Sequence, residues 1–138
     1  MAKSAFEKQL DAVLGVVFES KAQTPYEESR GRLRLVCDRI EKHLSGGGKK
    51  VVVTLQPGFK ANVGHQINVV VEVPQRQYRD TLFRAYIPDR GLPIALDFYG
   101  EQPVPVATHA DMERTILNFL AQDETRMRLQ AYMDLAAK

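Results

Sequence analysis

The sequence contains few of the residues that usually carry chemistry or crosslinks. It has one cysteine, no tryptophan and three histidines among 138 residues. A single cysteine excludes a disulfide within the chain, so nothing indicates an oxidising compartment. The histidines, His43, His65 and His109, are far apart and lack the close spacing typical of metal ligands. We therefore expect neither a metal nor a cofactor.

Long apolar runs are also absent. No stretch reaches the roughly 18 apolar residues that a membrane-spanning helix requires. The N-terminal residues, Met1 to Gln9, lack the apolar core of a signal peptide. We expect no membrane association and a cytoplasmic location.

Charge of one sign does not dominate either. The chain has 19 Lys and Arg against 17 Asp and Glu, a net charge of +2. Residues 49–100 carry seven basic and four acidic groups, so this region is only mildly basic. A dedicated nucleic-acid binder has a denser basic stripe. Nucleic-acid binding is expected to be weak at most, and its phosphate contacts would come from Lys49, Lys50, Arg76, Arg79 and Arg90.

Apolar residues at three- and four-residue spacing predict helices at both ends of the chain. One stripe predicts a helix over residues 4–21. A second helix begins at the capping box that starts at Thr24 and ends at Ser45-Gly46. Near the C-terminus, Thr108 and Asp123 are suitable N-caps for two more helices. We expect one helical hairpin at each end.

The middle of the chain alternates with the period of two typical of strands. Strands are predicted over residues 51–55, where Pro57-Gly58 follows, over residues 66–73, and on both sides of a turn at residues 88–91. Prolines in residues 101–106 allow at most an edge strand. The segregated helices and strands predict one α+β domain, residues 1–138, with a four-stranded, mainly antiparallel meander sheet flanked by N-terminal and C-terminal helical hairpins.

The turn Pro88-Asp89-Arg90-Gly91 predicts the register of its hairpin. If Ile87 lies opposite Leu92, one face of the hairpin is apolar. The expected pairs on that face are Ala85/Ile94, Phe83/Leu96 and Thr81/Phe98. The side chains expected on the other face are Leu82, Arg84, Tyr86, Asp97 and Tyr99.

Four residues of the second face are the candidate binding residues: Arg84, Tyr86, Asp97 and Tyr99. Tyrosine and arginine are enriched at the energetic centres of protein interfaces. The same face could instead be solvated, be covered by helices, or stack single-stranded bases. Asp97 and Glu72 argue against base stacking because they would repel phosphate.

Other polar residues have simpler structural interpretations. Cys37 lies on the apolar stripe of the second helix, which indicates a buried thiol. Asp89 is explained by turn chemistry. The segment Ser45–Lys50 is glycine-rich but follows a helix and precedes a strand, the reverse of a phosphate-binding loop.

The sequence therefore favours a small non-catalytic protein-interaction or assembly subunit. It would act through the polar and aromatic sheet face and through surplus apolar helix surface, binding a partner protein or a second copy. One alternative is a nucleic-acid-associated protein that uses the basic strand region. Another is an enzyme or small-ligand-binding protein with a site assembled from His65, His109, Asp97 and Arg84.

Overall fold

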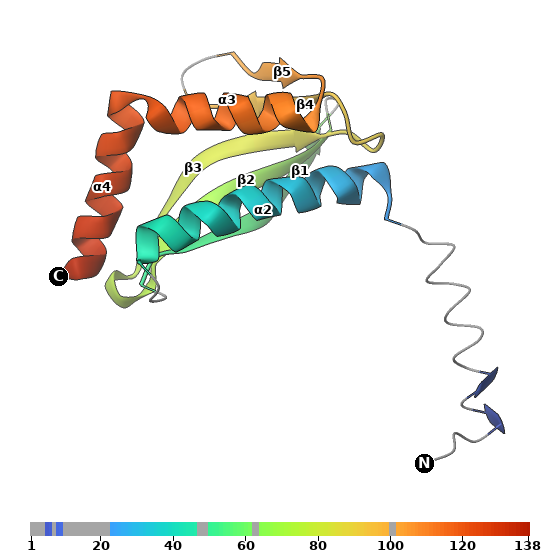
Figure 1. The fold of residues 1–138 in the computed structure, drawn as a ribbon, viewed down its shortest axis with the longest axis horizontal. Coiled ribbons are helices and arrows are strands. Elements are labelled where there is room, and N and C mark those ends of the chain that lie inside the picture. Colours follow the sequence, from blue (N-terminus) through green and yellow to red (C-terminus); the bar gives the residue numbers. More distant parts are fainter. Residues whose placement is uncertain (1–4, 7, 10–22, 47–49, 62–63, 100–101) are drawn as a thin grey trace.

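The computed structural model describes residues 5–6, 8–9, 23–46, 50–61, 64–99 and 102–138. In this part of the chain, a five-stranded antiparallel sheet and three α-helices form an α+β fold (Figure 1). The helices are α2 (Pro25–Ser45), α3 (His109–Ala121) and α4 (Asp123–Ala137). The strands are β1 (Val52–Ala61), β2 (Gly64–Val73), β3 (Tyr78–Ile87), β4 (Ile94–Asp97) and β5 (Val104–Val106), and the short helix η1 (Pro74–Arg76) joins β2 to β3.

Helix α2 confirms the second predicted helix and its capping signals. The backbone N–H of Glu27 donates to Oγ1 of Thr24 at 3.1 Å, and Pro25 is the first helical residue. At the other end, Gly46 takes the left-handed conformation with a φ of 57°. The helix predicted over residues 4–21 lies largely outside the described residues, so the N-terminal hairpin stays a prediction.

The strands follow one another across the sheet in the order β1-β2-β3-β4-β5. Helices α2 and α3 lie on the same side of the sheet, and α4 turns sharply away from the end of α3 (Figure 1). Ser29 lies beside His109 and Arg32 beside Glu113, so α2 and α3 run in the same direction. The core lies between these helices and one face of the sheet, and its largest fully buried side chains include Leu33, Phe83, Leu96, Met112 and Ile116.

The predicted hairpin turn is confirmed, but the predicted register is wrong by two residues. The N–H of Gly91 donates to the carbonyl of Pro88 at 2.8 Å, as expected of the turn. Ala85 nevertheless pairs with Leu96 rather than with Ile94. Pro93 has no N–H to donate to the ladder, so β4 pairs with β3 only from Ala95 onward and the connection is longer than predicted. A shift of two leaves every side chain of β4 on its predicted face.

A β-bulge in β3 overturns the predicted placement of Leu82. Val69 pairs with Phe83 whereas Val70 pairs with Thr81, which leaves Leu82 as the extra residue. Leu82 is fully buried in the core beside Phe83, although simple alternation placed it on the opposite face. Before the bulge the alternation is inverted, so Asp80 faces α4.

The sheet is also larger than predicted. Strand β1 continues beyond Pro57 to Ala61 through a register shift between Pro57 and Lys60, so the predicted stop there is wrong. Strand β5 adds a fifth strand, with Ile94 opposite Val106. The segment 101–106, predicted to form at most an edge strand, therefore contributes the edge strand β5.

Asp80 anchors α4 to the sheet. Nη2 of Arg128 donates to Oδ2 of Asp80 at 2.9 Å and to the Thr81 carbonyl at 3.2 Å. The Tyr132 hydroxyl donates to the same Asp80 oxygen, and burial, followed by this hydrogen bond, raises the pKa of Tyr132. Because the bulge turns Asp80 toward α4, it also determines where the last helix packs.

Cys37 is fully buried in α2, and burial raises the pKa of its thiol from 9.0 to about 12. Between these two values the unfolded thiol ionises while the native thiol stays neutral, so the contribution of Cys37 to stability should fall as pH rises. We expect the difference in free energy of unfolding between the parent and Cys37→Ala to narrow across this interval. Denaturant titrations below and within it measure the change.

Thiol labelling provides an independent check of this burial. The native protein should react slowly with a thiol reagent, and the denatured protein quickly, because only the exposed thiolate is nucleophilic. Rapid labelling of native protein would contradict the placement of Cys37 in the core.

Candidate functional site

We call the sheet face opposite the described helices the open face. Its side chains alternate with those of the core. Those of its three central strands include Gln66, Asn68, Arg84, Tyr86, Ala95 and Asp97. Among the described residues, no helix packs against this face; the core residues of α2, α3 and α4 belong to the cluster on the other side (Figure 1).

The structure brings the four candidate binding residues onto the open face. Arg84 and Asp97 are direct cross-strand partners. The guanidinium carbon of Arg84 lies 5.3 Å from the ring centre of Tyr99, within the range of a cation–π interaction. Tyr86 lies two residues along β3 from Arg84 and pairs with Gln66 and Ala95.

Several polar groups of the open face bind one another, but the Nε of Arg84 has no partner. Nε2 of Gln56 donates to Glu72 at 3.1 Å, and Nε2 of Gln66 donates to Asn68 at 3.2 Å. The Nε of Arg84 is buried without a hydrogen-bond partner in the described structure. A buried donor of this kind is uncommon in folded proteins because it has lost water without gaining an acceptor.

Both edges of the sheet resist the addition of another strand. On β1, the N–H of Val53 donates to Oε1 of Glu41 at 2.8 Å, and Oγ of Ser45 donates to the Val51 carbonyl at 3.3 Å. Pro57 lacks a donor altogether. On the far edge, Pro105 occupies the middle of β5. Charged caps and prolines are how proteins block edge pairing.

The two histidines near the hairpin loop belong to different clusters. Nε2 of His65 lies 2.6 Å from Oδ1 of Asp89, and Nζ of Lys60 lies 3.7 Å from the other carboxylate oxygen. The hydrogen bond from His65 and the charge of Lys60 lower the pKa of Asp89. The ring of Tyr26 packs on His65 with centres 4.5 Å apart. Sequence reasoning explained Asp89 as a turn residue and missed this cluster.

His109 takes part in a buried contact with Ser29 and the hairpin loop. Oγ of Ser29 donates to the Gly91 carbonyl at 2.6 Å and lies 2.9 Å from Nε2 of His109. A hydroxyl has one proton, so Nε2 of His109 must donate to Ser29. The serine is fully buried and its proton is bound to a carbonyl, which suits a structural contact rather than a nucleophile.

Gly91 fits this contact because it has no side chain. Its φ is 84°, and a Cβ built there would lie 2.5 Å from the Pro25 carbonyl oxygen. The loop therefore packs directly on the first turn of α2. The site predicted from His65, His109, Asp97 and Arg84 is not assembled: the histidines hold the loop, and the other two lie on the open face.

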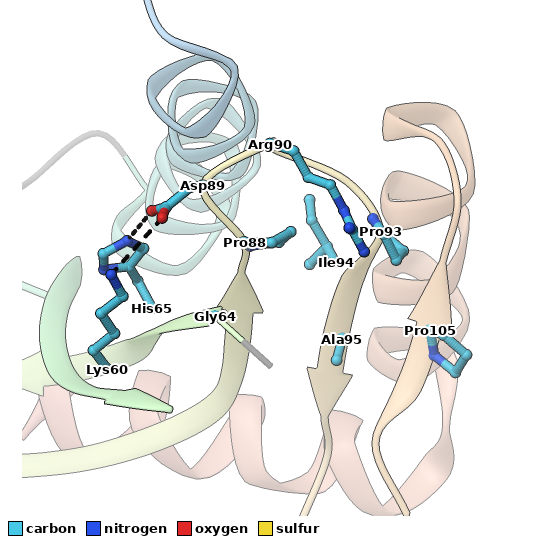
Figure 2. Close-up of a pocket in the computed structure, with 10 residues that line it drawn as sticks. All are labelled: Lys60, Gly64, His65, Pro88, Asp89, Arg90, Pro93, Ile94, Ala95 and Pro105. Atoms are coloured by element: carbon cyan, nitrogen blue, oxygen red, sulfur yellow. Dashed lines mark hydrogen bonds and ion pairs between the residues drawn. The ribbon is translucent and has the colours of Figure 1, made fainter. Parts of the chain in front are cut away.

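A hollow of about 630 Å³ lies beside the hairpin loop (Figure 2). We call it the loop pocket. Its apolar lining includes Pro88, Pro93, Ala95 and Pro105, and its rim carries Lys60, His65, Asp89 and Arg90. Ala95 pairs with Tyr86, so the pocket adjoins one end of the open face.

Other site types find little support in the described residues. These residues contain no group of three or more His, Cys, Asp or Glu side chains that could hold a metal ion. No helix in that part of the chain is long and apolar enough to cross a membrane. Among the basic residues, Arg76 and Arg79 follow β2 at one end of the sheet, whereas Arg90 lies in the loop at the other, and Lys49 falls outside the described residues.

Comparisons with known proteins do not assign a family. No family model matches the chain, and neither the curated proteins nor the solved structures contain a match.

Replacing Ser29 tests the contact between α2, α3 and the loop. Ser29→Ala removes the partner of both the Gly91 carbonyl and His109, so the free energy of unfolding should fall by about 1–3 kcal/mol. Ser45→Ala is the matched control, because Ser45 makes one longer bond at the sheet edge. Denaturant unfolding of both variants measures the difference, and equal effects would contradict the buried network.

Proposed function

We propose that this chain is a non-catalytic protein-interaction subunit that contacts its partner through the open face. The observation that carries the proposal is that α2 and α3 lie on one side of the sheet and the core residues of α4 belong to the same cluster. The other side presents Arg84, Tyr86 and Tyr99 together. A face that needed only to be solvated would not require two tyrosines and an arginine whose Nε is buried without a partner.

The chemistry of these side chains suits a protein contact. Tyrosine buries a large area at low cost in conformational entropy, and the unpaired donor of Arg84 gains most when an acceptor reaches it. Because caps and prolines protect the sheet edges, a partner would bind through side chains on the face rather than by strand addition.

The occupant that best fits the charges is a second copy of the chain. The open face carries its charges as neighbouring opposites, with Arg84 opposite Asp97, and Arg79 3.9 Å from Glu72. Across a two-fold axis the same patch meets itself, so each basic group can lie against an acidic one. A polyanion is disfavoured on this face because Glu72 and Asp97 would repel phosphate.

Surplus apolar surface on the helices is the alternative contact area to the open face. Leu35 on α2 and Leu117 on α3 are 58% and 65% exposed. The parallel register of the two helices, with Arg32 beside Glu113, places these leucines at similar heights. We also propose a cytoplasmic location, which the single, unpaired cysteine supports.

Replacing both tyrosines of the open face tests the proposed function. We expect Tyr86→Ser with Tyr99→Ser to weaken self-association at least about tenfold, because the centre of an interface carries most of its energy. The free energy of unfolding of the monomer should change by no more than about 1 kcal/mol, as at surface positions. Light scattering across a concentration series gives the dimer affinity, and denaturant unfolding gives the stability.

Leu35→Ser with Leu117→Ser is the matched control, with two exposed apolar side chains removed from the opposite side of the molecule. It should leave the dimer affinity unchanged. Loss of association in this control alone would move the contact to the helices. A parent protein that is monomeric at every concentration would contradict the second copy as occupant, and a tyrosine variant that keeps every complex of the parent would refute the open-face contact.

A further inference from the structure

The loop pocket has the size of a small-molecule site. Its volume of about 630 Å³ lies within the roughly 300–1,000 Å³ of typical ligand pockets. Its walls come from segments that are distant in sequence: the β1–β2 end, the hairpin loop, β4 and β5 (Figure 2). Neither Ser29 nor any of the four candidate binding residues lines this space.

The charges around the pocket are not balanced. Figure 2 shows Asp89 pointing to one side, where His65 and Lys60 bind it. Arg90 extends to the other side, along Pro93. Among the described residues, no carboxylate lies within salt-bridge distance of Arg90. The free charge on the rim is therefore positive.

Arg90 is also held in a defined orientation. Its Nε donates to the Leu92 carbonyl at 2.9 Å, which fixes the side chain against its own loop. This bond occupies one edge of the guanidinium and leaves the two terminal nitrogens for another acceptor. A carboxylate can bind such a pair of parallel donors with two hydrogen bonds.

The remaining lining is apolar and rigid. Pro88, Pro93 and Pro105 present ring surfaces, and Ala95 adds only a methyl group. Proline rings have little conformational freedom to lose, so a ligand would pay little entropy for ordering them. A compact apolar group can pack against these walls while its charged end remains at the rim.

We propose that the loop pocket binds a small organic acid, a compact apolar body that carries one carboxylate. The carboxylate lies end-on against the terminal nitrogens of Arg90, and the body packs against the proline-lined wall. None of the four candidate binding residues lines this site, although Ala95 belongs both to the pocket wall and to the open face beside Tyr86.

Titration of the ¹⁵N-labelled protein with 3-phenylpropionate tests the site. We expect saturable shifts at the backbone amides of Gly64, Arg90 and Ala95, with affinity in the weak range expected for so small a ligand. The corresponding uncharged alcohol, 3-phenylpropan-1-ol, should bind at least about tenfold more weakly because it lacks the charge that Arg90 pairs with. Equal binding of acid and alcohol, or shifts that map elsewhere, would overturn the proposal.

Two variants test separately how the charge of Arg90 and the volume of the pocket contribute to binding. Arg90→Gln should weaken binding of 3-phenylpropionate about tenfold or more. The control is Arg76→Gln, which replaces an exposed arginine at the other end of the sheet and should leave the binding of 3-phenylpropionate unchanged. Ala95→Leu should also weaken binding by filling the pocket. Unchanged amide signals outside the loop show that each variant is folded. An Arg90→Gln protein that binds like the parent would refute the site.

The C-terminal residue of a peptide carries the same chemistry as a free acid. A short peptide that ends in phenylalanine, with a free or an amidated C-terminus, distinguishes the two sources. Binding weaker than that of 3-phenylpropionate supports the free acid as ligand. Tighter binding that the amide abolishes would overturn the free acid in favour of a peptide terminus.

Discussion

The burial of one sheet face beneath the helices is the interaction on which the other features depend. Strand side chains alternate, so packing Phe83 and Ala85 into the core places Arg84 between them on the opposite side. Helices α2 and α3 run in the same direction along one face, and α4 is held at Asp80. The open face is therefore a direct consequence of how the core is closed.

The hairpin loop connects the core to the loop pocket. The Gly91 carbonyl is bound by Ser29 beneath the loop, and the Gly91 backbone packs on Pro25. The same short segment turns Asp89 toward His65 and Arg90 toward Pro93. Because the loop is held from below, these two charges point in different directions and leave the pocket with a positive rim.

The edges of the sheet explain why side chains rather than backbone groups are available for contact. Glu41 and Ser45 bind backbone groups at the start of β1, and each edge strand contains a proline, which has no backbone N–H to donate. These features remove the usual route by which sheets aggregate or capture extended peptides. Recognition then depends on the open face and the loop pocket, where side-chain chemistry provides specificity.

Local signals in the sequence determined the elements and most of their faces. The cap at Thr24 and the alternation around Arg84 depend on neighbours within a few residues, so both could be predicted. The register of the hairpin could not be predicted, because Pro93 postpones the pairing of β4 with β3. The burial of Leu82 could not be predicted either, because the bulge depends on packing against other strands. The clusters at His65 and Ser29 join segments far apart in the chain, a proximity that no local pattern encodes and only the tertiary structure decides.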